Sequence, residues 1–94
     1  MPEKTFKLEV LSPQQPVYTG EVTGIVAEGT EGSLGILYGH APLLTGLKKG
    51  SLKIQEPGEK VIHLTTEGGF MEVKQNHVLI FTEAATRGQK ESSQ

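Results

Sequence analysis

Residues 29–45 read GTEGSLGILYGHAPLLT and combine recurring glycines with apolar side chains. Glycine permits backbone angles that other residues avoid, so a cluster of glycines predicts tight turns or close approaches of the backbone. The same stretch carries Leu34, Ile36 and Leu37, which favour burial, and it ends in a compact apolar patch at residues 41–44. It is too interrupted for one long strand and too apolar for a flexible linker. We therefore expect a shaped loop that the rest of the chain holds in place.

Patterns of short strands flank this loop on both sides. In residues 5–11 and again in residues 51–56, apolar and polar side chains alternate, which is the two-residue period of a half-buried strand. Residues 56–59, Glu-Pro-Gly-Glu, predict a hairpin turn, because proline presets its first central position and glycine supplies the positive φ of the second. Runs of strand length recur about every 8–12 residues between turns, and no long helix is indicated. This spacing is typical of an antiparallel β-sandwich or barrel.

The second half of the chain gives further local predictions. Residues 48–50 are expected to form a turn, and residues 70–74 should pair with residues 78–82 in a hairpin. Residues 78–81 are apolar on both faces, which predicts a strand that is covered on both sides. Residues 83–87 are the only segment whose composition favours a helix.

Length and composition indicate one small β-domain. The chain has 94 residues, enough for a single domain. We expect the β-sandwich domain to span residues 1–86 and a polar, disordered tail to span residues 87–94. The hydrophobic share of 35% and the aromatic share of 5% predict a thin core, which suits a domain whose faces are completed by another subunit. So short a chain favours a flattened sandwich of two small sheets over a wide barrel.

Charge and residue usage exclude several functional classes. The net charge of −2 leaves no basic footprint, so nucleic-acid binding is not expected. The chain has no cysteine, which excludes disulfides, cysteine-based zinc sites and a thiol nucleophile. No apolar run approaches the ~20 residues that span a membrane, and the first residues lack a signal-peptide pattern. We expect a cytosolic domain without direct membrane insertion, and a peripheral place at a membrane, held by a partner, stays open.

The three histidines are the candidate reactive groups, and the sequence places none of them for catalysis. His40, His63 and His77 lack partners at the spacing of known metal motifs. His63 and His77 are expected to be ordinary surface residues, whereas His40 is either a contact residue or a structural residue that bonds a turn carbonyl. The glycines of residues 29–39 do not form a phosphate-binding loop, because no helix follows them. The residues alone predict a docking module without catalytic, metal-binding or cofactor-binding residues.

Residues 31–50, EGSLGILYGHAPLLTGLKKG, closely resemble the most typical segment of the epsilon subunits of bacterial and chloroplast F-type ATP synthases. Residues 6–13, 67–73 and 78–85 resemble flanking parts of the same family. The resemblance covers about residues 5–86 in one register. It implies the N-terminal domain of that family, which is a sandwich of two five-stranded sheets.

The resemblance also implies a function. Such a subunit belongs to the central stalk of the rotary proton-translocating ATP synthase, on the cytoplasmic face of the bacterial inner membrane. It docks on the gamma subunit and the c-ring and couples proton flow to ATP synthesis, while the alpha and beta subunits carry the catalysis. The subunit is therefore not an enzyme by itself and holds no cofactor. A stand-alone binding module with a pocket near His40 is the alternative, and an enzyme with His40 as a base is a third reading.

Site residues follow from the resemblance position by position. The expected contacts with the c-ring are Glu31, Gly32, Ser33 and His40. The expected contacts with the gamma subunit are Ser12, Tyr38, His40 and Thr45.

Three features depart from the family pattern. Ser33 stands where the family usually has Glu or Asp, so one ion pair with the c-ring is missing, at a cost of only ~0–1 kcal/mol. Tyr38 replaces the usual proline, which frees a backbone N–H and adds a ring that either contacts gamma or packs. The sequence ends at Gln94, before the C-terminal helical hairpin of most members, so it is either a naturally short member or a shortened one. We expect no nucleotide site and no inhibitory arm.

Overall fold

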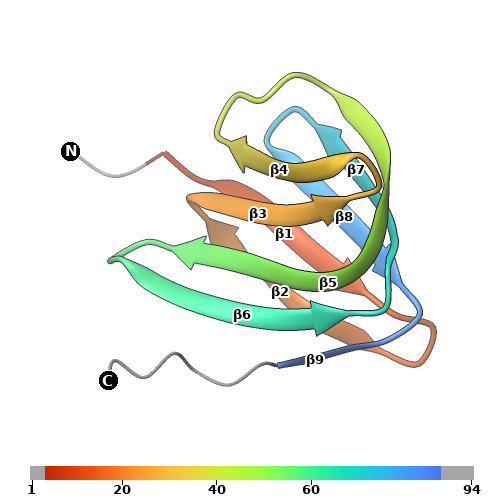
Figure 1. Cartoon of the computed structure of the whole chain (residues 1–94). Helices are drawn as coiled ribbons and strands as arrows, with labels where there is room; N and C mark the ends of the chain where they lie inside the picture. Colours follow the sequence, from red (N-terminus) through yellow and green to blue (C-terminus); the bar gives the residue numbers. More distant parts are fainter. Residues whose placement is uncertain (1–3, 88–94) are drawn as a thin grey trace.

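The computed structural model describes residues 4–87, which form strands and connecting loops and contain no helix (Figure 1). The strands are β1 (Phe6–Leu11), β2 (Pro16–Val22), β3 (Gly24–Gly29), β4 (Gly32–Leu37), β5 (Leu43–Glu56), β6 (Lys60–Thr66), β7 (Gly69–Lys74), β8 (His77–Thr82) and β9 (Ala85–Arg87). The all-β class predicted from the sequence is confirmed. The disordered tail was predicted for residues 87–94; Arg87 instead belongs to β9, and residues 88–94 lie outside the described residues.

Strand β5 belongs to two sheets, because its two halves have different neighbours. Residues 43–47 pair with β7, whereas residues 50–56 pair with β6. Sheet I therefore runs β2-β1-β8-β7-β5, and sheet II runs β4-β3-β5-β6-β9. Figure 1 shows β5 curving from one layer into the other. The two five-stranded sheets implied by the resemblance are present, and they share one long strand.

The pairing within the sheets is antiparallel with one exception. Strands β1 and β8 run parallel, with Lys7 opposite His77 and Leu11 opposite Phe81. Every other strand pair among the described residues is antiparallel. Because β1 and β8 run parallel, their C-terminal residues, Leu11 and Phe81, lie at the same end of sheet I.

The core lies between the two sheets and takes every second residue of most strands. Phe6, Leu8 and Val10 of β1 point inward and are buried, as the alternation predicts. The largest fully buried side chains come from both sheets, and they include Leu8, Ile25, Ile36, Leu52, Ile54, Leu64, Met71 and Ile80. The face of each sheet that points away from this core is exposed to solvent.

Three local predictions are wrong. Residues 48–50 do not turn, because β5 continues through them and bends instead. Residues 78–81 are not covered on both sides, because each sheet has an outer face and Phe81 lies on that of sheet I with 45% of its surface exposed. Residues 83–87 are not helical, because residues 85–87 pair with β6, and such pairing overrides a weak local preference.

Both predicted hairpins are confirmed. β5 and β6 are joined by a loop in which Gly58 has a φ of 83°, the positive angle predicted for this glycine. β7 and β8 pair through a short turn in which Asn76 has a φ of 58°. Turn chemistry alone therefore located two of the connections.

Two adjacent glycines secure the point where β5 changes sheets. Gly68 and Gly69 have φ angles of 94° and 140°, which disfavour residues with a side chain. A Cβ atom on Gly68 would lie 2.9 Å from the carbonyl oxygen of Leu47. A Cβ atom on Gly69 would lie 1.8 Å from the carbonyl oxygen of Phe81. The backbones approach so closely here that only glycine fits.

We predict that Gly69→Ala lowers the free energy of unfolding by at least about 3 kcal/mol, because the methyl group collides with fixed backbone in a disfavoured conformation. The matched control is Gly35→Ala in β4, where an added Cβ atom meets nothing within 4 Å. The control should change stability by no more than about 0.5 kcal/mol. Urea unfolding followed by circular dichroism measures both, and equal stabilities would contradict the prediction.

A hydrogen bond between side chains ties the two sheets together at one edge. Tyr18 of β2 is buried, and its hydroxyl donates to the carboxylate of Glu56 at the end of β5. Burial and the adjacent Glu56 raise the pKa of Tyr18 well above its ordinary value, while Arg87 opposes them. The folded protein therefore strongly favours the protonated hydroxyl.

We predict that Tyr18→Phe costs about 1–2 kcal/mol at neutral pH, because Glu56 loses its donor while the ring is kept. The raised pKa also gives a pH dependence. The contribution is complete below the unfolded tyrosine pKa of about 10, and it falls above that value by at most about 1.4 kcal/mol per pH unit. Unfolding curves between pH 7 and 11 should show this loss in the wild type and not in Tyr18→Phe. Tyr38→Phe, which removes an exposed hydroxyl, is the control and should behave like the wild type.

Candidate interaction surfaces

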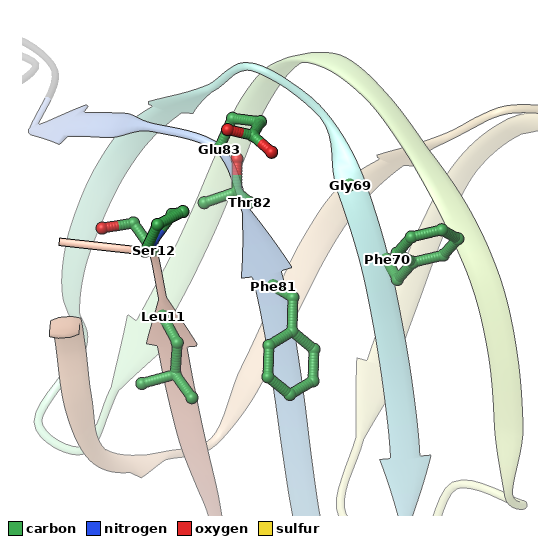
Figure 2. Close-up of a pocket in the computed structure, with 8 residues that line it drawn as sticks. Leu11, Ser12, Gly69, Phe70, Phe81, Thr82 and Glu83 are labelled. Carbon is green, nitrogen blue, oxygen red and sulfur yellow. The ribbon is translucent and has the colours of Figure 1, made fainter. Parts of the chain in front are cut away.

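The outer face of sheet I exposes large apolar side chains. Phe70 of β7 is 61% exposed, and Phe81 lies directly opposite it on β8. Leu11 is the partner of Phe81 on the other side, in the parallel pair with β1. Figure 2 shows the Leu11 and Phe81 side chains next to each other, with Phe70 on the adjoining strand. We call Leu11, Pro13, Phe70 and Phe81 the phenylalanine face.

A groove lies along this face at the end of sheet I. Its volume is about 440 Å³, and its lining includes the phenylalanine face together with Ser12, Gly69, Thr82 and Glu83. Gly69 pairs with Thr82, and Gly46 pairs with Phe70 on the β5 side. Gly46 therefore adds no side chain beside Phe70 on this face. The volume lies within the ~300–1,000 Å³ range of typical binding clefts.

The polar groups of the groove differ in what they already bind. The Ser12 hydroxyl donates to the carbonyl of Gln15 at 2.8 Å, and the Thr82 hydroxyl donates to the carbonyl of Ala84 at 3.0 Å. The carboxylate of Glu83 is exposed and makes no hydrogen bond or ion pair with residues 4–87. Among residues 4–87, Glu83 is also the only charged residue in the groove lining. The groove is therefore apolar with one negative charge at its rim (Figure 2).

The opposite end of sheet I's outer face is charged. Lys7 Nζ lies 3.3 Å from the Glu9 carboxylate, and His77 Nε2 lies 3.7 Å from the same carboxylate. Lys74 Nζ lies 3.9 Å from the carboxylate of Glu72. The two lysines are thus already paired with carboxylates on this face.

The turn between β3 and β4 forms a second candidate surface. Glu31 is exposed in this turn, and Gly32 has a φ of 129°. The Ser33 hydroxyl lies 3.3 Å from the carboxylate oxygens of Glu28 and donates to them. A groove of about 400 Å³ adjoins the turn and is also lined by Thr45. Glu28 thus places a carboxylate beside Ser33.

His40 and Tyr38 lie in the loop between β4 and β5. His40 Nδ1 lies 2.7 Å from the carbonyl oxygen of Ala41, and the His40 N–H donates to the carbonyl of Leu37 at 3.1 Å. These contacts support the structural reading of His40. The cavity beside His40 has a volume of only about 10 Å³, room for one water molecule, so it offers no ligand pocket. Lys4 Nζ lies 5.4 Å from the centre of the Tyr38 ring.

The structure separates the residues that the resemblance grouped. Glu31, Gly32 and Ser33 lie together, whereas His40 follows the far end of β4. Ser12 lies at the phenylalanine face, and Thr45 lies beside the Glu31 turn. Sequence reasoning missed Phe70 and Phe81, although the doubly apolar run of residues 78–81 was a signal for them.

Two further searches of the described residues concern metals and membranes. Residues 4–87 contain no group of three or more side chains that could hold a metal ion. None of the elements described is a helix of the length and hydropathy needed to cross a bilayer.

Comparison with known proteins identifies the family. Residues 5–88 match the family described as ATP synthase, Delta/Epsilon chain, beta-sandwich domain. The ATP synthase epsilon chain of Pelotomaculum thermopropionicum is 44% identical over 90 residues, which are 96% of this chain and 66% of that protein. That of Desulforamulus reducens is 42% identical over 84 residues, which are 89% of this chain and 63% of that protein. That of Chlorobium limicola is 40% identical over 81 residues, which are 86% of this chain and 92% of that protein.

Solved structures show the same fold. A chain of the mitochondrial ATP synthase of Euglena gracilis, solved with OSCP, F1 and the c-ring, superposes with a TM-score of 0.85 at 25% identity. The match covers 93% of this chain and 56% of that one. A chain from the central stalk and c-ring of the Tetrahymena thermophila enzyme superposes with a TM-score of 0.73 at 22% identity over 90% of this chain and 68% of that one, which shows the fold alone. The present chain thus spans somewhat less than two thirds of the first two epsilon chains compared, and it belongs to the family of β-sandwich domains of ATP synthase delta/epsilon chains.

Proposed function

We propose that this chain is a non-catalytic subunit of the central stalk of a rotary, proton-translocating ATP synthase. It couples rotation of the c-ring to the gamma subunit, and catalysis belongs to the alpha and beta subunits. Three relatives carry the name epsilon chain, and the Euglena assembly contains a c-ring, which supports this role. The subunit sits peripherally at the cytoplasmic face of the bacterial inner membrane, held there by its partners.

The phenylalanine face is the observation that carries the proposal. Phe70 and Phe81 expose much of their surface side by side, and Leu44 on the next strand is 71% exposed. Contiguous exposed apolar patches on soluble proteins mark interaction sites. We assign this face, with Ser12 at its rim, to the gamma subunit. The other proposed gamma contacts are Tyr38, His40 and Thr45, and contact with them needs a partner that also reaches the β4–β5 loop and the Glu31 turn.

The Glu31 turn suits the c-ring. Glu31, Gly32 and Ser33 form a polar projection between two strands, and Glu28 adds a second carboxylate beside Ser33. Polar loops of a partner can pair with these groups without burying apolar surface. His40 remains a proposed c-ring contact, and it would meet the ring only if the ring also covers the far end of β4.

We predict that Phe70→Ser weakens binding to gamma at least tenfold, because exposed aromatic anchors dominate the energy of interfaces. The alpha–beta–gamma complex of Pelotomaculum thermopropionicum, prepared without its own epsilon chain, is a suitable partner for titration by biolayer interferometry. The control is Val61→Ser, which removes an exposed apolar side chain from the outer face of sheet II. Unchanged affinity of Phe70→Ser, with the fold intact by circular dichroism, would reject the assignment of this face.

We predict that Glu31→Lys reduces ATP-driven proton pumping of the reconstituted complex several-fold at low salt, because a single exposed charge contributes at most about 1 kcal/mol and reversal doubles its effect. The defect should shrink as ionic strength rises. Glu59→Lys, in the distant β5–β6 turn, reverses an equally exposed charge and should pump normally. Identical pumping by the two variants would count against contact between the Glu31 turn and the c-ring.

A further inference from the structure

We infer that the groove of the phenylalanine face receives a short basic segment of its partner, with an aliphatic stem or apolar side chain along Phe70 and Phe81 and a lysine or arginine head at Glu83. This inference rests on the proposed docking of gamma at this face. It adds the chemistry of the segment that binds there.

The apolar part of the proposed segment is inferred from the size and lining of the groove. It is lined by two adjacent cross-strand pairs of β7 and β8, Gly69 with Thr82 and Phe70 with Phe81. At about 440 Å³ the groove is too large for one side chain and suits a short stretch of chain. Its apolar walls gain free energy when such a segment excludes water from them.

The basic character of the proposed segment is inferred from the carboxylate of Glu83 at the groove rim. The hydroxyls of Ser12 and Thr82 already donate to backbone carbonyls, so neither is a free donor for a ligand. Within residues 4–87, Glu83 makes no ion pair and no cationic residue lines the groove. The Glu67 N–H donates to the carbonyl of Ala84, the residue after Glu83, and the Glu67 carboxylate lies 3.7 Å from Lys49 Nζ. The described part of the groove rim therefore carries one negative charge, that of Glu83.

A lysine or arginine side chain can contact the apolar lining of the groove and also place its positive charge at Glu83. Lysine and arginine lay their methylene stems on apolar surface while the charged head stays at the water boundary. A guanidinium or ammonium group above the Phe70 or Phe81 ring gains a further cation–π attraction. An acidic or phosphorylated segment would instead place its charge against Glu83. The groove thus selects for a cation.

The decisive experiment compares Glu83→Gln with Glu59→Gln in the titration against the alpha–beta–gamma complex, at 50 and 300 mM salt. Glu83→Gln should weaken binding about five- to tenfold at low salt and flatten the salt dependence, and Glu59→Gln should do neither. If the wild type binds, Phe70→Ser weakens binding and Glu83→Gln does not, the proposed function stands and the basic-segment inference is overturned. If the wild type does not bind gamma at all, the proposed function fails.

A second measurement tests the groove without gamma. The isolated chain is titrated with n-butylguanidinium, n-butanol and butyrate while amide NMR shifts are followed. n-Butylguanidinium should shift the signals of Phe70, Phe81 and Glu83 at concentrations where butyrate does not, and Glu83→Gln should abolish the difference. Equal shifts from all three probes would show a groove indifferent to charge and would overturn the inference.

Discussion

The rest of the structure depends on the close backbone contact at Gly68 and Gly69. These residues bring the start of β7 against the carbonyls of Leu47 and Phe81, at the point where β5 leaves sheet I for sheet II. With the crossing fixed, β5 lends five residues to one sheet and seven to the other, and the two layers enclose one core. A domain with a 35% hydrophobic share and no tryptophan has little apolar surface to spare, so sharing a strand keeps both layers closely packed over it.

The same contact shapes the candidate binding surface. Gly69 lines the groove, and Phe70, which follows it immediately, points to the outer face of sheet I. Alternation along β7 therefore sends Met71 into the core and leaves Phe70 in solvent. The short stretch Gly68-Gly69-Phe70 thus both fixes the crossing of β5 and positions the exposed Phe70 ring.

The sequence predicted what depends on local chemistry and missed what depends on long-range pairing. Alternation located the inward residues of β1, and the glycine at position 58 located its hairpin. Residues 48–50 were misread as a turn, because Lys-Lys-Gly is typical of turns and only the pairing with β6 and β7 extends them. Phe81 was misread as covered, because apolar character on both faces of a strand does not say whether the second face meets the chain's own core or a partner. The resemblance brought Ser12, Thr45 and His40 together, whereas their register places them at three different parts of the sandwich.

The two candidate surfaces lie close together along the backbone, although we propose different partners for them. Gly46 of β5 pairs with Phe70 on one side, and its carbonyl accepts a hydrogen bond from the Thr30 N–H at 3.1 Å on the other. Thr30 adjoins Glu31, so only one strand and one hydrogen bond separate the phenylalanine face from the Glu31 turn. A side chain at position 46 would crowd Thr30, whose methyl carbon would lie 3.3 Å from the added Cβ atom. The turn and the face are therefore joined through paired backbone. For a subunit that we propose to join a rotating ring to a shaft, this connection offers a short path for transmitting load between the two surfaces.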